Sequence, residues 1–451
     1  MSPIPHCTGA APLSPALRSF EAQWLARARV TPPDPLMRLR EDAMNRVLRL
    51  GLPTTRDESW RYTNLRRLSV HDFVDAPDSA HGSFDPTASL SLLSGAVRAA
   101  TVLMVNGRPV LPTAIDTCIN GIELSNLREV ARIDPALVAA YLGPLSDADQ
   151  ARWAMLNTAL FQDGLYVKVT ANVATPLVIL HALTADGTNN IAYPRVIIDV
   201  MPGASATIIE HYVEQGEQPP FCNSATHVAA RRDSYVEHYR VFATSATAEH
   251  IDSLSIRQEG NSRCKQFTIA LGGGLVRTTL EASLDEAGAR LDNYSLLVGH
   301  EARHVDCVNI ATHNARDTTS RQTARAIASG SSRVVFNTKV VVNAGAVHAE
   351  SQQSCRGLLL SPSAEIDTRP QLEIHADEVK CAHGATTGRL DPDMLFYMLS
   401  RGIDRETAQT LLVYAFLADV LTDMSVPSAR SAIESALIAQ LPDSQTLNKF
   451  R

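Results

Sequence analysis

Apolar residues near the N-terminus recur at the spacing of a helix. Ser14, which is followed by proline, is typical of a helix start, and a second start is predicted at Asp34 with Gly51 as its stop. A stretch rich in Pro, Asp, Ser and Gly over 75–94 predicts a loop, and a further helix is expected over 147–161. The apolar stripe of the first helix consists of Leu17, Phe20 and Trp24.

From about residue 164 to residue 390 the pattern changes to short apolar runs. The runs 196–200 and 339–342 are rich in β-branched residues, which is typical of strands. More than 200 residues of this kind without long helices predict a large β unit, and a sandwich, a pair of barrels or a β-solenoid would each fit. The turn intervals are irregular, so no repeat selects among the three. Small turn groups are centred on Gly203, Gly288, Gly330 and Gly345.

The sequence beyond residue 390 is helical again. Asp391 and Asp404 are predicted to begin two helices, with Gly402 between them. In the second helix the residues 411–418 (LLVYAFLA) are apolar around almost the whole circumference, so this helix needs two surfaces to bury them, its own core and a protein partner. A last helix is expected beyond Pro427. The predicted organisation is an N-terminal helical domain with a short β piece (1–163), a β core (164–390) and a C-terminal helical domain (391–451).

Composition and charge narrow the classes of function. The 451 residues are too many for one compact core, and 45% hydrophobic with 20% charged residues is typical of a soluble globular protein. A net charge of −7 without a basic stripe gives no reason to expect a nucleic-acid or membrane partner. Residues 1–15 lack the pattern of a signal peptide, and no run approaches the roughly 18 apolar residues of a membrane span. A cytoplasmic location is therefore expected.

The spacing of the cysteines and the absence of the common catalytic motifs narrow the classes of function further. The seven cysteines are widely spaced without a C-x-x-C pair, so neither a disulfide framework nor a stably bound zinc ion or iron–sulfur cluster is predicted. A phosphate-binding loop, a G-x-S-x-G elbow and an H-E-x-x-H motif are all missing, and we expect no enzymatic activity. The glycine run 272–274 is interpreted as a tight turn.

Two short segments carry candidate metal ligands. A strand over 373–377 would place Glu373, His375 and Asp377 on one face, where they could bind iron or manganese, although a solvated strand face is the preferred interpretation. Cys381 and His383 are also two residues apart, and a thiolate and an imidazole suit iron or the edge of a cluster. On spacing alone, a buried cysteine and a hydrogen-bonded histidine is the better interpretation of this pair.

The residues around this pair resemble a known family. The segment 370–386, which ends in KCAHGAT, is similar to the SufD family, subunits of the SufBCD iron–sulfur cluster assembly complex. The segments LFY and SRGI further along, and QSCRGLLLS over 353–361, agree with it. So does the region 51–63, which contains GLPT and ESWRYT. The resemblance covers the chain from near residue 50 to near residue 420.

The paralogous SufB family differs at two places. SufB carries a cysteine followed by Gly-Ala-His in the strand before its own His-rich motif, whereas 361–367 contains no cysteine here. SufB also has a glutamate directly after the matching histidine, where this chain has Gly384. Two positions depart from the SufD pattern as well, Cys355 in place of asparagine and His375 in place of an aromatic residue, so neither takes a family role.

The resemblance implies a fold, partners and a site. It implies a right-handed parallel β-helix between N- and C-terminal helical domains, in a complex with a SufB-type paralogue and a SufC-type ABC ATPase. A nascent cluster would form transiently at the interface with the paralogue, with His383 contributing and Cys381 matching the adjacent family cysteine; no cofactor would be stably bound. The isolated chain could form a homodimer. The ATPase would dock on the C-terminal helices, where the candidate residues are Phe396, Tyr397, Arg401, Leu411, Leu412, Tyr414 and Phe416.

Three functions remain open at this point. The favoured one is a non-catalytic scaffold subunit, because the missing phosphate-binding loop and the scattered cysteines agree with it. The second is an independent β-solenoid enzyme, a polysaccharide lyase or a metal hydrolase, with Glu373, His375 and Asp377 as its site. The third is a purely structural subunit that stabilises its partners without touching iron.

Overall fold

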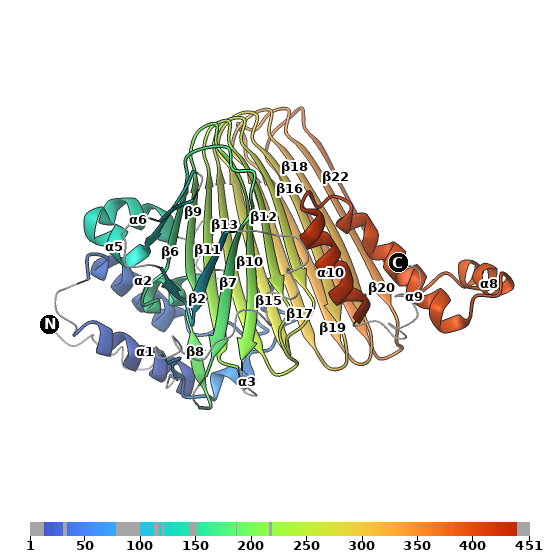
Figure 1. The fold of residues 1–451 in the computed structure, drawn as a ribbon, viewed down its shortest axis with the longest axis horizontal. Helices are drawn as coiled ribbons and strands as arrows, with labels where there is room; N and C mark the ends of the chain where they lie inside the picture. Colours follow the sequence, from blue (N-terminus) through green and yellow to red (C-terminus); the bar gives the residue numbers. More distant parts are fainter. Residues whose placement is uncertain are drawn as a thin grey trace.

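The protein is an elongated β structure with helices at both ends (Figure 1). The computed structural model describes residues 13–29, 34–77, 100–111, 117–119, 121–143, 151–185, 187–215 and 219–439. Most of the loop predicted over 75–94 and the first part of the helix predicted over 147–161 lie outside these ranges; the described part of that helix is α7 (Arg152–Leu160).

The main strands belong to two sheets, between which the chain alternates from β9 onward. In chain order they are β6 (Leu165–Val169), β7 (Leu177–Thr184), β8 (Asn190–Ala192), β9 (Arg195–Val200), β10 (Ser205–Gln215), β11 (Phe221–Ala230), β12 (Tyr235–Phe242), β13 (Glu249–Gln258), β14 (Arg263–Ala270), β15 (Leu275–Leu284), β16 (Arg290–Gly299), β17 (His304–His313), β18 (Thr319–Ala328), β19 (Arg333–Val342), β20 (Glu350–Leu359), β21 (Glu365–Ile374) and β22 (Lys380–Gly388). Smaller strands precede them: β1 (Val74–Asp75), β2 (Ala100–Val105), β3 (Arg108–Val110), β4 (Thr117–Ile119) and β5 (Ile122–Asn126).

One sheet runs β21-β19-β17-β15-β13-β11-β9-β6-β5-β4, and the other runs β22-β20-β18-β16-β14-β12-β10-β7-β2-β3. We call them the β21 sheet and the β22 sheet. From β6 and β7 onward each turn of the chain adds one strand to each sheet, and successive turns pair in parallel. The chain is therefore a parallel β-solenoid flanked by helices, as predicted.

In-register stacking makes the interior of the solenoid from columns of residues. We call a set of residues that pair in register on successive turns of one sheet a register column. Because side chains alternate along a strand, every second column points inward, and most inward columns are apolar. One such column of the β21 sheet, packed in the core, is Val228, Ile256, Ala282, Ala311, Val340 and Leu372.

The corners of the solenoid confirm the predicted turns, since all four predicted glycine groups lie between strands. The run 272–274 is a tight turn between β14 and β15. A Cβ on Gly272 would lie 2.0 Å from the carbonyl oxygen of Thr244 on the preceding turn, and Gly273 has φ +94°. Only glycine fits such a corner without moving the backbone beside it. The run predicted at 339–342 forms the last four residues of the longer strand β19.

The N-terminal helices cover the start of the solenoid. Ser14 accepts a hydrogen bond from the Leu17 amide at the start of α1 (Pro15–Arg27), as predicted. The second helix, α2 (Met37–Leu50), begins later than expected, because Asp34 uses its carboxylate to cap the amide of Leu36 in the turn before the helix. Among the buried aromatic rings of this region, Phe20 packs against both Phe73 and Trp153.

A strap of the N-terminal region, residues 54–63, lies along the outer face of the β21 sheet. Trp60 is 1% exposed, and its ring lies 3.7 Å from the guanidinium carbon of Arg277 on β15. Arg277 forms an ion pair with Asp306 on β17 and donates to the carbonyl of Ser59 at 2.7 Å. Glu58 pairs with Arg369 on β21, so the strap reaches the last turn of this sheet.

The C-terminal helices confirm their predicted caps. Asp391 caps α8 (Pro392–Ser400), and Asp404 caps α9 (Arg405–Leu421) by accepting from the Thr407 amide at 3.0 Å. With α10 (Pro427–Ala439), α9 packs on the outer face of the β22 sheet (Figure 1). There the rings of Tyr239, Phe267 and Tyr294 stack on successive turns at centroid distances of 4.7 and 4.8 Å.

The Trp60 contact generates a prediction for the fold. Trp60→Ala should lower the free energy of unfolding by about 3–5 kcal/mol, because it empties a buried site under which Arg277 and Asp306 are paired. Urea denaturation followed by circular dichroism measures the change. Arg61→Ala is the matched control, since Arg61 is exposed and its loss should cost less than about 0.5 kcal/mol. Equal effects of the two variants would show that the strap does not contribute to stability.

Candidate functional site

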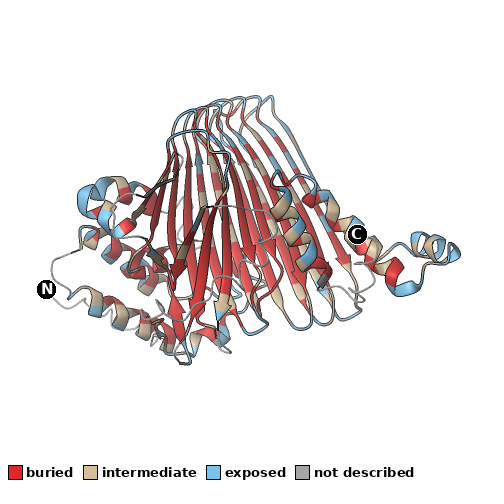
Figure 2. Ribbon diagram, in the orientation of Figure 1, coloured by how far each residue is buried: buried red, intermediate tan, exposed pale blue. Residues whose placement is uncertain are grey.

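The solenoid ends on two open strand edges. β21 and β22 are the last strands of their sheets, and among the described residues no strand pairs with their outer edges. Every residue of both strands is at least partly exposed, whereas most of β11 and β12 is buried. Figure 2 shows the change from buried to exposed toward the C-terminal end of the sheets. We call this surface the open end.

Cys381 and His383 both lie on β22 and face the solenoid interior. Cys381 packs against the inner apolar cluster, and His383, two residues further along the same strand, must point the same way. His383 pairs in register with Gln353, which is 2% exposed, yet His383 itself is exposed because no further turn is stacked on it in the described part of the chain. Partial burial raises the pKa of the Cys381 thiol. The structure thus places both residues together at the mouth of the interior.

The second candidate set, Glu373, His375 and Asp377, does not share a strand face. β21 ends at Ile374, and Asp377 lies in the bend that follows, so this part of the sequence prediction is wrong. The carboxylate of Glu373 lies 2.6 Å from Nζ of Lys339 and 2.9 Å from Nε2 of His375. Hydrogen bonds from these two groups lower the pKa of Glu373 to about 2. The preferred interpretation, a solvated surface, agrees with these contacts.

His, Cys, Asp and Glu side chains elsewhere in the described ranges form ion pairs instead of a metal site. In the described ranges no group of three or more His, Cys, Asp or Glu side chains could hold a metal ion. His348, in the corner between β19 and β20, is exposed, and its two ring nitrogens each lie 3.2 Å from a carboxylate, Asp317 and Glu378, in a surface ion-pair cluster. Lys380, next to Cys381, pairs with Glu350 at 2.8 Å.

The C-terminal candidates fall into two groups. In α8 every residue is exposed or half-exposed, and the helix projects from the body beyond the sheets (Figures 1 and 2). Phe396 is 72% and Tyr397 59% exposed, and Arg401 lies over the Tyr397 ring. In α9 the candidates Leu411, Leu412, Tyr414 and Phe416 are half-buried, while Val413 and Leu417 beside them are buried against the β22 sheet. The predicted second surface of this apolar helix is therefore only partly covered.

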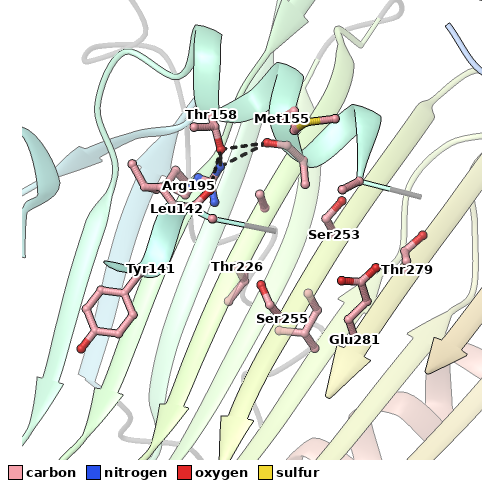
Figure 3. Close-up of a pocket in the computed structure, with 15 residues that line it drawn as sticks. Tyr141, Leu142, Met155, Thr158, Arg195, Thr226, Ser253, Ser255, Thr279 and Glu281 are labelled. Carbon is pink, nitrogen blue, oxygen red and sulfur yellow. Dashed lines mark hydrogen bonds between the residues drawn. The ribbon is translucent and has the colours of Figure 1, made fainter. Parts of the chain in front are cut away.

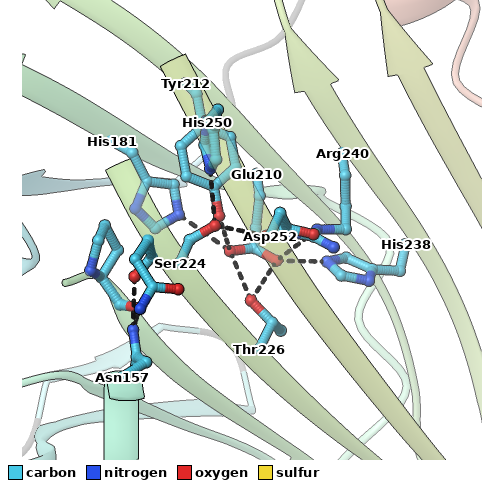
Figure 4. A network of polar contacts seen from close by, with 12 residues as sticks. Asn157, His181, Glu210, Tyr212, Ser224, Thr226, His238, Arg240, His250 and Asp252 are labelled. Carbon is cyan, nitrogen blue, oxygen red and sulfur yellow. Dashed lines mark hydrogen bonds and ion pairs between the residues drawn. The ribbon is translucent and has the colours of Figure 1, made fainter. Parts of the chain in front are cut away.

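A buried polar network inside the first turns escaped the sequence reasoning (Figure 4). The carboxylate of Glu210, 0% exposed, lies 2.9 Å from Nε2 of both His181 and His238, and Arg240 is paired with Asp252. Burial alone raises the pKa of Glu210, but the hydrogen bonds from His181 and His238 outweigh it, and the pKa lies well below its ordinary value. The sequence does contain one sign of this network, which is pairs of polar residues two positions apart within strands, so that both side chains point to the same face. These pairs are Glu210 with Tyr212, His238 with Arg240, and His250 with Asp252.

A small cavity lies where α6 (Pro135–Leu142) and α7 meet the outer face of the β21 sheet (Figure 3). Arg195, 4% exposed, lines it and donates to Asn157 at 2.9 Å and to Thr158 at 2.7 Å. The cavity volume is about 30 Å³. That is room for roughly two water molecules, far below the ~300 Å³ or more of a typical small-molecule site. This cavity therefore cannot accommodate a sugar unit.

No helix within the described ranges is long and apolar enough to cross a membrane.

Two family profiles match the chain over nearly its whole described length. The one described as "SUF system FeS cluster assembly, SufBD core domain" matches residues 182–416, which contain most of the solenoid and the open end. The chain belongs to the SufBD family. The profile described as "SufBD protein N-terminal region" matches residues 26–179, and the strap lies within that range. The family resemblance drawn from the sequence motifs is thereby confirmed.

Individual SufBD relatives agree with this assignment. The chain is 29% identical over 408 residues to the "Iron-sulfur cluster assembly protein SufD" of Escherichia coli (strain K12), covering 88% of this chain and 92% of that protein. It is 28% identical over 414 residues to the "Iron-sulfur cluster assembly SufBD family protein slr0076" of Synechocystis, covering 89% and 90%. It is 22% identical over 420 residues to the SufD protein of Bacillus subtilis, covering 89% and 93%. These relatives support a role in iron–sulfur cluster assembly.

The buried network generates a prediction for the pH dependence of stability. Burial, and then the charge of Arg240, hold the pKa of His250 well below its ordinary value, so the native ring is neutral. Below about pH 6.5 the unfolded chain binds a proton that the native chain does not, so stability falls by up to about 1.4 kcal/mol for each pH unit. Thermal unfolding between pH 7 and pH 5 should show a smaller loss in His250→Asn than in the wild type. A wild-type slope in His250→Asn would contradict the assignment.

Proposed function

We propose that this SufBD protein is a non-catalytic scaffold subunit that shares a transient iron–sulfur cluster with a SufB-type paralogue at its open end. The observation that carries the proposal is the position of Cys381 and His383 at the uncovered mouth of the solenoid. The cluster is cargo in this proposal, built and released, rather than a resident cofactor.

The donor set at the open end supports a shared site. A thiolate and an imidazole are both iron ligands, but each iron of a cluster needs four ligands in all, and this strand offers two donors. Further ligands would come from the sulfide of the cluster and from the paralogue. The raised pKa of Cys381 means that its thiol must lose a proton as iron binds, which is usual for a thiolate ligand.

The two open strand edges supply the means of assembly. Exposed edges present unpaired backbone N–H and C=O groups, and pairing with the edges of a second chain satisfies them. A paralogue with the same fold would offer matching edges, and both interiors would then meet at the same plane. A homodimer of the isolated chain would use the same edges.

The C-terminal helices support the docking of a SufC-type ABC ATPase. A projecting helix with exposed Phe396 and Tyr397 and a stacked Arg401 has the residue types that dominate binding energy at interfaces. The half-buried residues Leu411, Leu412, Tyr414 and Phe416 of α9 would extend this surface. ATP hydrolysis would take place on the ATPase alone.

The central test replaces the candidate iron ligand. We expect His383→Ala to reduce cluster formation by at least about tenfold, because loss of a metal ligand costs no less than loss of the groups that orient ligands. The measurement is anaerobic cluster formation on the chain co-expressed with its SufB-type paralogue and ATPase, followed by visible absorbance. His375→Ala is the matched control, an exposed histidine at the same end that faces away from the interior.

Full cluster loading by His383→Ala would remove His383 from the mechanism. Full loading by a variant that lacks both Cys381 and His383 would go further and favour a purely structural role for this chain. Recovery of the intact complex from each variant, checked by size-exclusion chromatography, separates a lost ligand from a lost assembly.

A second prediction concerns the ATPase surface. Replacing both Phe396 and Tyr397 by alanine should raise the Kd for the ATPase by about 30-fold or more, since even one aromatic anchor at an interface centre contributes about 2 kcal/mol or more. Isothermal titration calorimetry measures it. Ile133→Ala, at a 70% exposed apolar side chain of α5 (Leu127–Ile133), serves as the control and should leave the Kd unchanged. An unchanged Kd in the double variant would place the ATPase elsewhere.

A further inference from the structure

A register column of the β22 sheet is polar instead of apolar. It begins at the buried network with His238, runs through the interior and ends at the open end. Its successive members are 27 to 31 residues apart in sequence and pair in register, turn upon turn. They are His238, Gln266, Asn293, Gln322, Gln353 and His383.

The four amides of this column are buried, and seven of their eight polar side-chain atoms have no hydrogen-bond partner in the described part of the chain. Gln266 is 0%, Asn293 and Gln322 are 1%, and Gln353 is 2% exposed. Gln266 donates to the carbonyl of Phe267 at 3.0 Å, but its oxygen is unpartnered. Both polar side-chain atoms of the other three are unpartnered among the described residues. Buried polar groups in native proteins are nearly always hydrogen-bonded, so a run of adjacent exceptions points to partners other than protein atoms.

The neighbouring register column shows that the spacing between turns does not prevent hydrogen bonds between side chains. Ser320 and Ser351 lie on the same two turns as Gln322 and Gln353, and their hydroxyl oxygens are 2.9 Å apart and bond directly. The two amides, with longer side chains on the same backbone spacing, do not bond each other. They point into the interior, where inward polar atoms of the two sheets also meet: Asn309 on β17 donates to Ser295 on β16 at 3.1 Å.

We infer that the solenoid interior holds a file of ordered water along the amides Gln266, Asn293, Gln322 and Gln353, ending beneath His383. Water both donates and accepts, so it satisfies the amide N–H and the amide C=O together, and buried water makes about three hydrogen bonds to such groups. With adjacent strands about 4.8 Å apart, the five steps from His238 to His383 span roughly 24 Å. The water file therefore joins the buried charged network to the open end.

Internal water that ends beneath His383 would also contact the proposed cluster site. The hydration of the amides does not depend on the proposed function. The role of this water beside a cluster at His383 does rest on the proposed function. When a partner subunit covers the open end, this internal water is the solvent that stays in contact with the inward edge of His383. Cargo bound there would then exchange hydrogen bonds and protons with the inside of the solenoid.

The test counts long-lived water in the full-length chain. Gln322→Met with Gln353→Met keeps the length of both side chains and removes their four polar atoms. Oxygen-17 magnetic relaxation dispersion should then show fewer long-lived waters, by at least one for each replaced amide. Leu297→Met is the matched control, since Leu297 is 0% exposed, lies inside the same sheet and carries no polar side-chain atom. It should keep the wild-type water count.

Two outcomes would overturn the inference. An unchanged water count in the double variant, together with a raised Tm, would mean that the amides are dry and that the methionines removed an unmet hydrogen-bonding cost. A crystal structure that resolves ordered water but shows the amides bonded to one another would also overturn it. That crystal structure of the wild type decides the question if the double variant does not fold. Because neither readout involves iron, the inference can fail while the proposed function stands, and the reverse.

Discussion

In-register stacking of parallel turns is the constraint on which the rest of this structure depends. Each turn buries the inward side chains and the backbone edges of the turn before it, so the interior grows by repetition. At the N-terminal end, helices and the small strands β2 to β5 cover the first turns. At the C-terminal end β21 and β22 remain open, and residues that would be interior on any earlier turn become surface. The candidate site lies on this last turn. Cys381 and His383 occupy inward-facing positions, and they are exposed because they belong to the last strand of the sheet.

The same stacking explains why polar groups can be buried in the core. A parallel strand that is covered on both faces has no solvated side, so a polar residue at an inward position must find its partner across the solenoid or along its column. Glu210 finds two imidazoles and Arg240 finds Asp252, which forms a compact charged network within the first turns. Ser320 and Ser351 find each other along their column. Among the described residues the amide column has neither kind of partner, and in our proposal internal water takes the place of both.

Local chemistry predicted much of the fold. The caps at Ser14, Asp391 and Asp404, and the glycine corners at 272–274, depend on neighbouring residues and are visible in the sequence. Register depends on residues about 30 positions apart, so the sequence could not show which inward residues share a column. For the same reason the sequence does not reveal the network around Glu210. It also predicts one strand over 373–377, whereas β21 ends at Ile374. The pair at 381 and 383 was found through its family motif, because its spacing alone is ordinary.

The most direct test of the open end as half of a shared site is hydrogen–deuterium exchange along the β22 sheet. In the isolated chain, kept monomeric by dilution, the amides of β22 should exchange faster than those of β16, which is paired on both sides. On binding a SufB-type paralogue, the account predicts strong protection of β22 and little change in β16. Unchanged exchange in β22 within a stable complex, with protection appearing on another surface, would contradict the account.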